Sequence, residues 1–410
     1  MKVMITNAYG RSNRGDSVLL DECIAEITSA VPDAEIGCSV FEGIAASRAV
    51  HPDVTWSERI GNTSASGKLA KLVTLMRLLI AALATVPGLS FVARLLPSSQ
   101  YQSWKMIRAA DIVVSAPGGY IHDTNFAYYV ALLHIFLPRK AARNILAPQS
   151  IGPIDTPFAR LIARWIFMKT DAICARESYS WHFLHETLAL PERLLRRSGD
   201  SAFWNFYVSN AGPAIVQAWH EIGVEPSAKP ILGLTVVNWT FPKSVDMEMK
   251  RRDYVTSMAK IIDHMTKAHD MQPVIFNQVS DDLPMAERIA AACDTQVAID
   301  RTSREPEELR ALIGRSSLFL GTRFHSCIFA MMADRPTQAI AYLPKTSYIL
   351  RDLKLDERQF PIDDLDPTAV IAALERDFSD LATARAEISG AVETYRQTHA
   401  KLSDVLQETT

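Results

Sequence analysis

Short apolar runs alternate along the chain with longer segments in which apolar residues recur at helical spacing. Each run is about four to eight residues long and ends in glycine or polar residues, which is typical of buried strands. Strands that alternate with helices in this way indicate parallel sheets. The runs predict strands at 2–7, 34–41, 111–115, 144–148, 172–175, 194–198, 230–237, 273–276, 296–299, 317–320 and 337–341.

The strand signal lapses between residues 205 and 229 and resumes at Pro230. We therefore predict an N-terminal α/β domain at 1–205 and a second α/β domain at 206–366. Residues 367–410 read as a C-terminal helical tail that packs on either domain, with Ile388, Val392 and Tyr395 near helical spacing. The expected fold class is α/β, with two Rossmann-like domains facing a cleft lined by the ends of their strands.

Two segments between the second and third predicted strands lack strand signal. Residues 43–66 are polar and are expected to form a loop. Residues 69–96 are apolar but interrupted by Lys71, Arg77 and Arg94, and the longest uncharged run, 78–93, is shorter than the roughly 20 residues that span a bilayer. We expect either a buried helix pair or an interfacial surface with basic edges. The second alternative would give peripheral membrane contact through 69–96.

Composition narrows the class of protein. The chain has 410 residues, of which 48% are hydrophobic, and its net charge of −3 argues against nucleic acid as a partner. Its five cysteines are scattered without a C-x-x-C pair, which predicts a reducing compartment and no structural zinc. Met1-Lys2 leads directly into a predicted strand with no signal-peptide pattern, so we expect a cytoplasmic protein.

The clearest candidate site follows the predicted strand 317–320. Gly321-Thr322 ends that strand, and a helical apolar pattern begins at Ser326. Arg323 and His325 therefore lie in the turn between a strand end and a helix start, where open α/β sheets bind ligands. Free N–H groups and the helix dipole favour an anion there, and a permanent cation beside an imidazole suits phosphate or carboxylate.

Similar polar residues follow other predicted strands. The first strand leads into a small-residue loop with Gly15, and paired glycines Gly118 and Gly119 allow close approach of a ligand to the backbone. The dinucleotide fingerprint G-x-G-x-x-G is absent, and so is G-x-S-x-G. The polar residues expected at strand ends are Asn13, Asp16, Asp123, Gln149, Arg176, Asp200, Arg323, His325 and Lys345.

Taken together, these residues fit a small ligand with several negative charges. The cations would bind the anion, while the carboxylates would act as acid, base or acceptors of sugar hydroxyls. Taken singly, Asp16, Asp123 and Asp200 would equally well cap helices or hold loops. His182 and His185 lie three apart on a predicted helix, but too few ligands surround them for a metal site, so we expect no metal there.

At this point the motifs resemble a known family. Asn13-Arg14-Gly15-Asp16, Gly118-Gly119-x-x-x-Asp123, Gln149-Ser150-Ile151-Gly152-Pro153, Ala175-Arg176-Glu177-x-x-Ser180, Gly199-Asp200, Gly321-Thr322-Arg323-Phe324-His325-Ser326 and Tyr342-x-x-Lys345 occur in the order seen in polysaccharide pyruvyl transferases. The resemblance extends from residue 1 to about 350. It is closest to the branch that modifies repeat units of bacterial exopolysaccharide or capsule.

The resemblance implies a two-domain fold like that of the GT-B glycosyltransferases. It also implies transfer of a pyruvyl group from phosphoenolpyruvate to two hydroxyls of one sugar, which forms a cyclic ketal and phosphate. Arg323 and His325 match the family's phosphoenolpyruvate-binding R-x-H, and Arg176 is the candidate for a further arginine. The N-terminal domain would bind the acceptor and the C-terminal domain phosphoenolpyruvate. The chain departs from the family in having Asn238 where an arginine is common, and only two glycines at Gly118-Gly119.

The residue types suit this chemistry. His325 would act as the acid or the proton donor to phosphate, Asp16 or Asp123 would deprotonate or orient the acceptor, and Lys345 would stabilise the leaving phosphate. The family's acceptors are lipid-linked oligosaccharide or polysaccharide at the inner face of the plasma membrane. Two alternatives stay open, namely a nucleotide-sugar glycosyltransferase of the same fold and a non-catalytic protein that binds glycans or anions.

Overall fold

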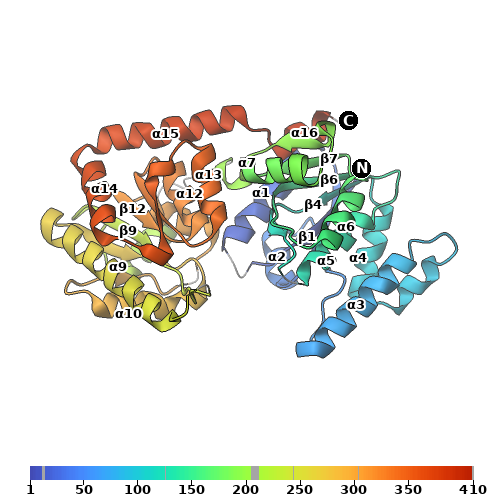
Figure 1. Ribbon diagram of the computed structural model, residues 1–410, viewed down its shortest axis with the longest axis horizontal. Coiled ribbons are helices and arrows are strands. Elements are labelled where there is room, and N and C mark those ends of the chain that lie inside the picture. The colour runs from blue at the N-terminus through green and yellow to red at the C-terminus, as the bar shows by residue number, and fades with distance from the viewer. Residues whose placement is uncertain (12–13, 125, 205–211, 243, 303, 409–410) are drawn as a thin grey trace. The chain divides into compact units, whose positions relative to one another are not determined.

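The computed structural model describes residues 1–410 except 12–13, 125, 205–211, 243, 303 and 409–410 (Figure 1). The chain divides into two compact units. Unit 1 consists of Met1–Ser12, Asp16–Ser201 and His399–Thr410, and unit 2 of Asn13–Gly15 and Ala202–Thr398. Each unit is a parallel sheet with helices on its faces, as the alternating pattern predicts. The predicted separate tail is divided, because its last residues belong to unit 1 and the rest to unit 2.

The sheet of unit 1 has the order β3-β2-β1-β4-β6-β7-β8, with β5 paired to β6. The order reverses beside β1, since β2 lies on one side of it and β4 on the other, and ligands bind beyond the strand ends at such a point. The strands are β1 (Lys2–Ala8), β2 (Glu35–Val40), β3 (Thr55–Glu58), β4 (Ile112–Ser115), β5 (Gly118–Ile121), β6 (Arg143–Ile151), β7 (Ala172–Ala175) and β8 (Leu195–Arg197).

The helices of unit 1 cover three apolar cores in the described residues, one of them formed by α5, α6 and α7 against β6 and β7. Side chains of α1 and α16, including Ile27 and Leu406, pack with Ile5 of β1 in one core. Side chains of α3 and α4 pack with Met4 and Val113 in another. The helices are α1 (Arg14–Ala30), α2 (Ile44–Val50), α3 (Gly67–Leu83), the 3-10 helix η1 (Ser90–Leu95), α4 (Ser98–Ala109), α5 (Ala127–Phe136), α6 (Pro157–Phe167), α7 (Ser178–His182) with the π-helical turn η2 (Phe183–Thr187), the 3-10 turn η3 (Glu192–Leu194), and α16 (Leu402–Glu408).

One prediction for unit 1 is wrong, and one of the two alternatives for residues 69–96 is excluded. Residues 43–66 are not a loop, because they contain α2 and the edge strand β3. Residues 69–96 are not a buried helix pair: α3 is followed by a single 3-10 helix, and within α3 only Leu78 and Ala81 are fully buried. Within the described residues, no helix is both long enough and apolar enough to cross a membrane.

Unit 2 repeats the same architecture with the strand order β11-β10-β9-β12-β13-β14. Its order reverses beside β9, which pairs with both β10 and β12. The strands are β9 (Ile231–Thr235), β10 (Gln272–Ile275), β11 (Ala298–Ile299), β12 (Leu318–Gly321), β13 (Thr337–Ala341) and β14 (Gln359–Pro361). The helices are α8 (Pro213–Ile222), α9 (Met247–His269), α10 (Leu283–Ala292), α11 (Pro306–Ile313), α12 (Phe324–Met332), α13 (Pro344–Asp352), α14 (Pro367–Ser379) and α15 (Leu381–Thr398), with 3-10 turns at Ser280–Asp282, Asp356–Arg358 and Ile362–Asp364.

Candidate functional site

Arg323 lies at the strand-end edge of unit 2, between the end of β12 and the start of α12. Its Nε and Nη2 donate to the two carboxylate oxygens of Asp282, each at 2.7 Å. Asp282 is 4% exposed and Arg323 18%, so the pair is largely shielded from water. Burial alone would lower the pKa of Arg323, but the bonds to Asp282 and the nearby Tyr342 raise it above its ordinary value. The guanidinium is therefore charged and held in a fixed orientation.

A second arginine reaches the same edge through Asn238, which follows β9. The backbone N–H of Asn238 donates to Asp282 Oδ1 at 2.8 Å, and Asn238 Oδ1 accepts from Nη2 of Arg251 at 2.6 Å. Arg251 comes from the second turn of α9 rather than from the loop after β9. Asn238 thus positions the cation of Arg251. Neither Arg251 nor Asp282 was predicted from the sequence as a site residue. The acidic run Asp281-Asp282 after β10 is the sequence signal that could have pointed to Asp282.

The next strand contributes two further polar groups. Arg323 Nη1 donates to the hydroxyl of Tyr342 at 3.3 Å, and Tyr342 follows β13, the neighbour of β12. Lys345 lies in the first turn of α13 and is half-buried. His325, in the first turn of α12, is 6% exposed. The cations Arg323, Arg251 and Lys345 thus belong to loops and helix starts at the carboxyl ends of adjacent strands, with one buried carboxylate among them.

In unit 1, the predicted site residue Gln149 belongs to a buried polar network. Its Nε2 donates to the hydroxyl of Tyr120 at 2.7 Å and to the carbonyl of Ala116. The Tyr120 hydroxyl also lies 3.1 Å from Ser115 Oγ, which accepts from Asn7 at 2.9 Å. This network joins the ends of β1, β4, β5 and β6. It explains why tyrosine follows the paired glycines and indicates that Gln149 fixes the position of Gly118 and Gly119, which form the start of β5 and not the turn expected from the sequence.

Arg176 is buried and paired with two acids. It lies 3.5 Å from Glu177 and 3.4 Å from Asp200, and all three side chains are at most 1% exposed. A Cβ added to the exposed Gly119 would lie 3.5 Å from Arg176 Nη2, so the guanidinium lies directly behind that glycine. Burial raises the pKa of Glu177, although Arg176 acts in the opposite direction. With two carboxylates around one cation, this cluster is built mainly to hold the ends of β7 and β8.

The same cluster connects two of the sequence motifs. Glu177 accepts from Ser150 Oγ at 2.7 Å and from Ser180 Oγ, and Ser180 Oγ in turn accepts from the backbone N–H of Ile151 at 2.7 Å. The Q-S-I-G-P motif at the end of β6 is therefore bonded to the R-E-x-x-S motif at the start of α7. Sequence order alone does not reveal this pairing, because 27 positions separate Ser150 from Glu177.

The two candidate carboxylate bases differ in surroundings. Asp123 Oδ2 accepts backbone N–H groups of Asp155 at 3.1 Å and Thr156 at 2.9 Å, at the start of α6. Burial alone would raise the pKa of Asp123, but these bonds hold it below its ordinary value. Asp16 lies half-buried beside Gly15 in the first turn of α1. Asn13 lies outside the described residues.

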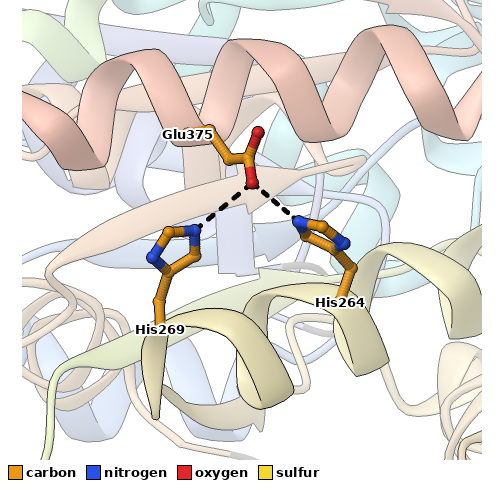
Figure 2. Close-up of side chains that lie close together, drawn as sticks. All are labelled: His264, His269 and Glu375. Atoms are coloured by element: carbon orange, nitrogen blue, oxygen red, sulfur yellow. Dashed lines mark hydrogen bonds and ion pairs between the residues drawn. The ribbon is translucent and has the colours of Figure 1, made fainter.

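A possible metal-ligand set occurs elsewhere in unit 2. His264 and His269 of α9 both point toward Glu375 of α14, with Nε2 to Oε1 distances of 2.7 and 3.4 Å (Figure 2). All three ligand atoms lie within 4.8 Å of one another. The group is at the end of α9, which leads into the start of β10, so it lies at the opposite edge of the sheet from Arg323. His182 instead pairs with Glu186 at 2.9 Å and His185 with the Leu190 carbonyl, and neither is part of a three-ligand group within the described residues.

The fold is that of GT-B glycosyltransferases and related epimerases. A glycosyltransferase from Rickettsia africae ESF-5 superposes with a TM-score of 0.61 at 12% identity, over 100% of this chain and 96% of that one. A UDP-GlcNAc 2-epimerase from Neisseria meningitidis, bound to UDP-GlcNAc, gives 0.58 at 10% identity, over 97% of this chain and 99% of that one. At these identities the likeness concerns the fold alone.

The sequence carries the more specific relationship. Residues 13–344 match the family model for polysaccharide pyruvyl transferase, and the chain belongs to that family. It is also 21% identical over 426 residues to the amylovoran biosynthesis protein AmsJ of Erwinia amylovora, with 99% of both chains covered. The resemblance noted from the ordered motifs is thereby confirmed.

Proposed function

We propose that the protein transfers the pyruvyl group of phosphoenolpyruvate to two hydroxyls of one sugar in a polysaccharide repeat unit, forming a cyclic ketal and phosphate. The observation that carries the proposal is the Arg323–Asp282 pair, with Arg251 and Lys345 on the neighbouring elements. Phosphoenolpyruvate carries a phosphate and a carboxylate. An oriented guanidinium with further cations at adjacent strand ends suits such a dianionic head. Family membership and the relative AmsJ support a sugar polymer as the acceptor.

The reaction needs one acid, one base and anion stabilisation. An acid protonates the methylene carbon of phosphoenolpyruvate, and the adjacent carbon becomes cationic. One sugar hydroxyl adds to that carbon and gives its proton to a base. The bond between carbon and phosphate oxygen then breaks, and the second hydroxyl adds to close the ketal. The two hydroxyl protons balance the reaction, one matching the proton gained by the new methyl group and one leaving with phosphate.

We assign these roles to residues whose surroundings suit them. His325, at the start of α12, is the proposed acid or the proton donor to phosphate, and Arg323 and Arg251 bind the anionic groups. Lys345 stabilises the leaving phosphate. Asp16 or Asp123 is the proposed base, and backbone N–H bonds lower the pKa of Asp123 and thus weaken it as a base. Arg176 is a positioning residue beneath Gly119, given its two carboxylate partners. The scheme uses no metal and no cofactor.

The test is a thermal-shift titration with phosphoenolpyruvate and, separately, with UDP-sugars. At about 100 times the dissociation constant, a ligand stabilises the folded state by about 2.7 kcal/mol. We expect phosphoenolpyruvate to stabilise the wild type. The variant Arg323→Lys should bind it at least about tenfold more weakly, because lysine keeps the charge but not the two parallel bonds to Asp282 that orient the guanidinium. Lys345→Ala should weaken binding less, and Arg301→Ala, an exposed arginine of the same unit, should leave it unchanged.

A shift with a UDP-sugar and none with phosphoenolpyruvate would overturn the proposal in favour of a glycosyltransferase. Binding of phosphoenolpyruvate without phosphate release in the presence of a sugar acceptor would favour a non-catalytic binding protein. His325→Gln should abolish phosphate release while retaining phosphoenolpyruvate binding, which separates the proposed acid from a merely structural histidine.

A further inference from the structure

The long surface helix of unit 1 presents its apolar stripe to solvent. Five residues of α3 recur at helical spacing, and the same surface continues into η1 with Phe91 and Leu95. The α3 residues are 48–64% exposed, whereas the fully buried positions of this helix are only Leu78 and Ala81. The five stripe residues are Leu69, Leu72, Met76, Leu79 and Leu83. An apolar stripe facing water is unusual for a monomeric protein and marks an interaction surface.

A second helix repeats this arrangement. Phe158, Leu161, Trp165 and Met168 follow one another at helical spacing on α6 and just after it, and are 41–65% exposed. The opposite face of α6 is buried and consists of small and apolar side chains such as Ala159 and Ala163. Between the two helices, α5 contacts both α3 and α6. Phe136 of α5 stacks on Trp165 at a centroid distance of 5.4 Å, so the exposed aromatic surface continues from α6 onto α5.

The charges of the segment that contains α3 all have one sign. Residues 59–110, which contain α3, η1 and α4, include no aspartate or glutamate, although the whole chain has a net charge of −3. Lys68, Lys71 and Arg94 are exposed. The cations of this segment are Arg59, Lys68, Lys71, Arg77, Arg94, Lys105 and Arg108. Long basic side chains beside an apolar stripe are typical of helices that lie in a membrane interface.

A basic groove lies where the three helices end. It has a volume of about 710 Å³, and its lining includes Thr85 after α3, Phe136 of α5 and Met168 after α6. Arg108 donates to the carbonyl of Leu137 at 2.8 Å, and its pKa is lowered by burial and by Arg139 nearby. The ammonium of Lys169 lies 3.4 Å from the ring centre of Trp165. Five cations line the groove, Arg108, Arg139, Lys140, Lys169 and Arg193, against the single carboxylate of Asp171.

We infer that α3, η1 and α6 with this groove form a docking surface for an anionic lipid bilayer. The apolar stripes insert into the bilayer, and the cations bind headgroup phosphates. Charge complementarity selects this occupant over a second copy of the chain. A symmetric contact through α3 would bring Lys68 and Lys71 against their own equivalents, with no carboxylate in residues 59–110 to offset them. The inference does not depend on the proposed donor or reaction.

The experiment is flotation of the full chain with vesicles of phosphatidylcholine, with or without about one-third phosphatidylglycerol. The wild type should bind the anionic vesicles at low salt and much less in about 0.5 M salt. Leu72→Gln with Leu79→Gln should weaken binding at least about tenfold, because two exposed apolar side chains no longer insert. Lys68→Gln with Lys71→Gln should weaken it by about fivefold for each cation removed. Arg139→Gln with Lys140→Gln should reduce binding to the anionic vesicles only.

Matched controls come from unit 2. Val216→Gln changes an equally exposed apolar residue and Lys260→Gln an exposed lysine, and neither should alter binding. All substituted side chains are exposed, so circular dichroism should show unchanged folding. A wild type that ignores anionic vesicles at low salt would overturn the inference, as would leucine variants that bind like the wild type. If light scattering instead finds a dimer that only the leucine variants lose, and vesicles are not bound, the occupant is a second copy.

Discussion

At the scale of single residues, Asp282 and Arg323 should stabilise unit 2 only as a pair. Removing one partner leaves a charge in surroundings where Asp282 is 4% exposed. Breaking such a pair typically costs about 3–5 kcal/mol, whereas replacing both partners costs much less. We therefore expect Asp282→Ala to lower the free energy of unfolding by about 3 kcal/mol, and the double variant with Arg323→Ala to lose less than the sum of the single variants. Urea unfolding measures all three.

The exposed pair Arg301–Glu287 provides the control for this cycle. Its nitrogen to oxygen distance is 3.4 Å, but both side chains are more than half exposed. Removing either partner should change stability by no more than about 1 kcal/mol. Equal, additive losses in the Asp282 and Arg323 variants would mean that the bidentate contact contributes no coupling energy.

Asp21 is expected to give unit 1 a pH-dependent contribution. Its carboxylate accepts from Arg11 at 2.7 and 3.2 Å and from His51 at 2.8 Å. Burial opposes ionisation, but these two partners hold the pKa of Asp21 below its ordinary value. A folded-state pKa below the unfolded value of about 3.9 means that the stabilisation is present above that value and disappears as the pH falls through the folded-state pKa.

Asp21→Asn should therefore reduce the free energy of unfolding by about 1–3 kcal/mol near neutral pH. The difference from the wild type should stay constant between about pH 7 and pH 5 and should shrink as the pH is lowered further toward about 2, through the unfolded value of about 3.9 and then the folded-state pKa, because protonated aspartate resembles asparagine. Urea midpoints measured along this series check the sign. A difference that stays constant over the series would show that the ionised carboxylate has no special role in fixing the loop after β1.

At the scale of elements, the strands were predictable and the sources of some contacts were not. Parallel strands covered on both faces are continuous apolar runs, so β1, β4, β9 and β12 stand out in the sequence. The edge strand β3, Thr55–Glu58, has only four residues, of which Trp56 alone is apolar, and it is preceded by a short helix, so the segment reads as a loop. Edge strands are buried less completely and thus leave a weaker pattern.

The candidate site shows the same limit. Arg323 and His325 could be located because they follow a strong strand and precede a strong helix. Asp282 and Arg251 escaped prediction because their partners lie 41 and 13 positions away, and no local spacing links them. The apolar stripe of α3 was visible in the sequence, but its periodicity is the same whether the stripe faces a core or the solvent. Only packing decides between the two.

At the scale of the whole molecule, residues near the end of the sequence pack into unit 1, which also contains its first residues. Leu402, Val405 and Leu406 of α16 are at most 1% exposed and pack in the core of unit 1 beside Ile27. The backbone N–H of Ala400 donates to the carbonyl of Arg197 at 3.0 Å, and that of Ser403 donates to Glu26 at 2.9 Å. Unit 1 is therefore completed only when α16 has been made, after residues 202–398 of unit 2.

Deleting residues 399–410 should accordingly unfold unit 1 and spare unit 2. Each of the three buried side chains contributes about 1.5–3 kcal/mol, and their sum is comparable to the stability of an entire domain. In hydrogen exchange, the amides of β1 and β4 should lose protection while those of β9 and β12 retain it. Leu406→Ala, which costs about 2–4 kcal/mol, should produce the same pattern in weaker form. Equal loss of protection in both sheets would mean that the units unfold as one cooperative structure, and no loss in either would mean that α16 adds nothing to the core of unit 1.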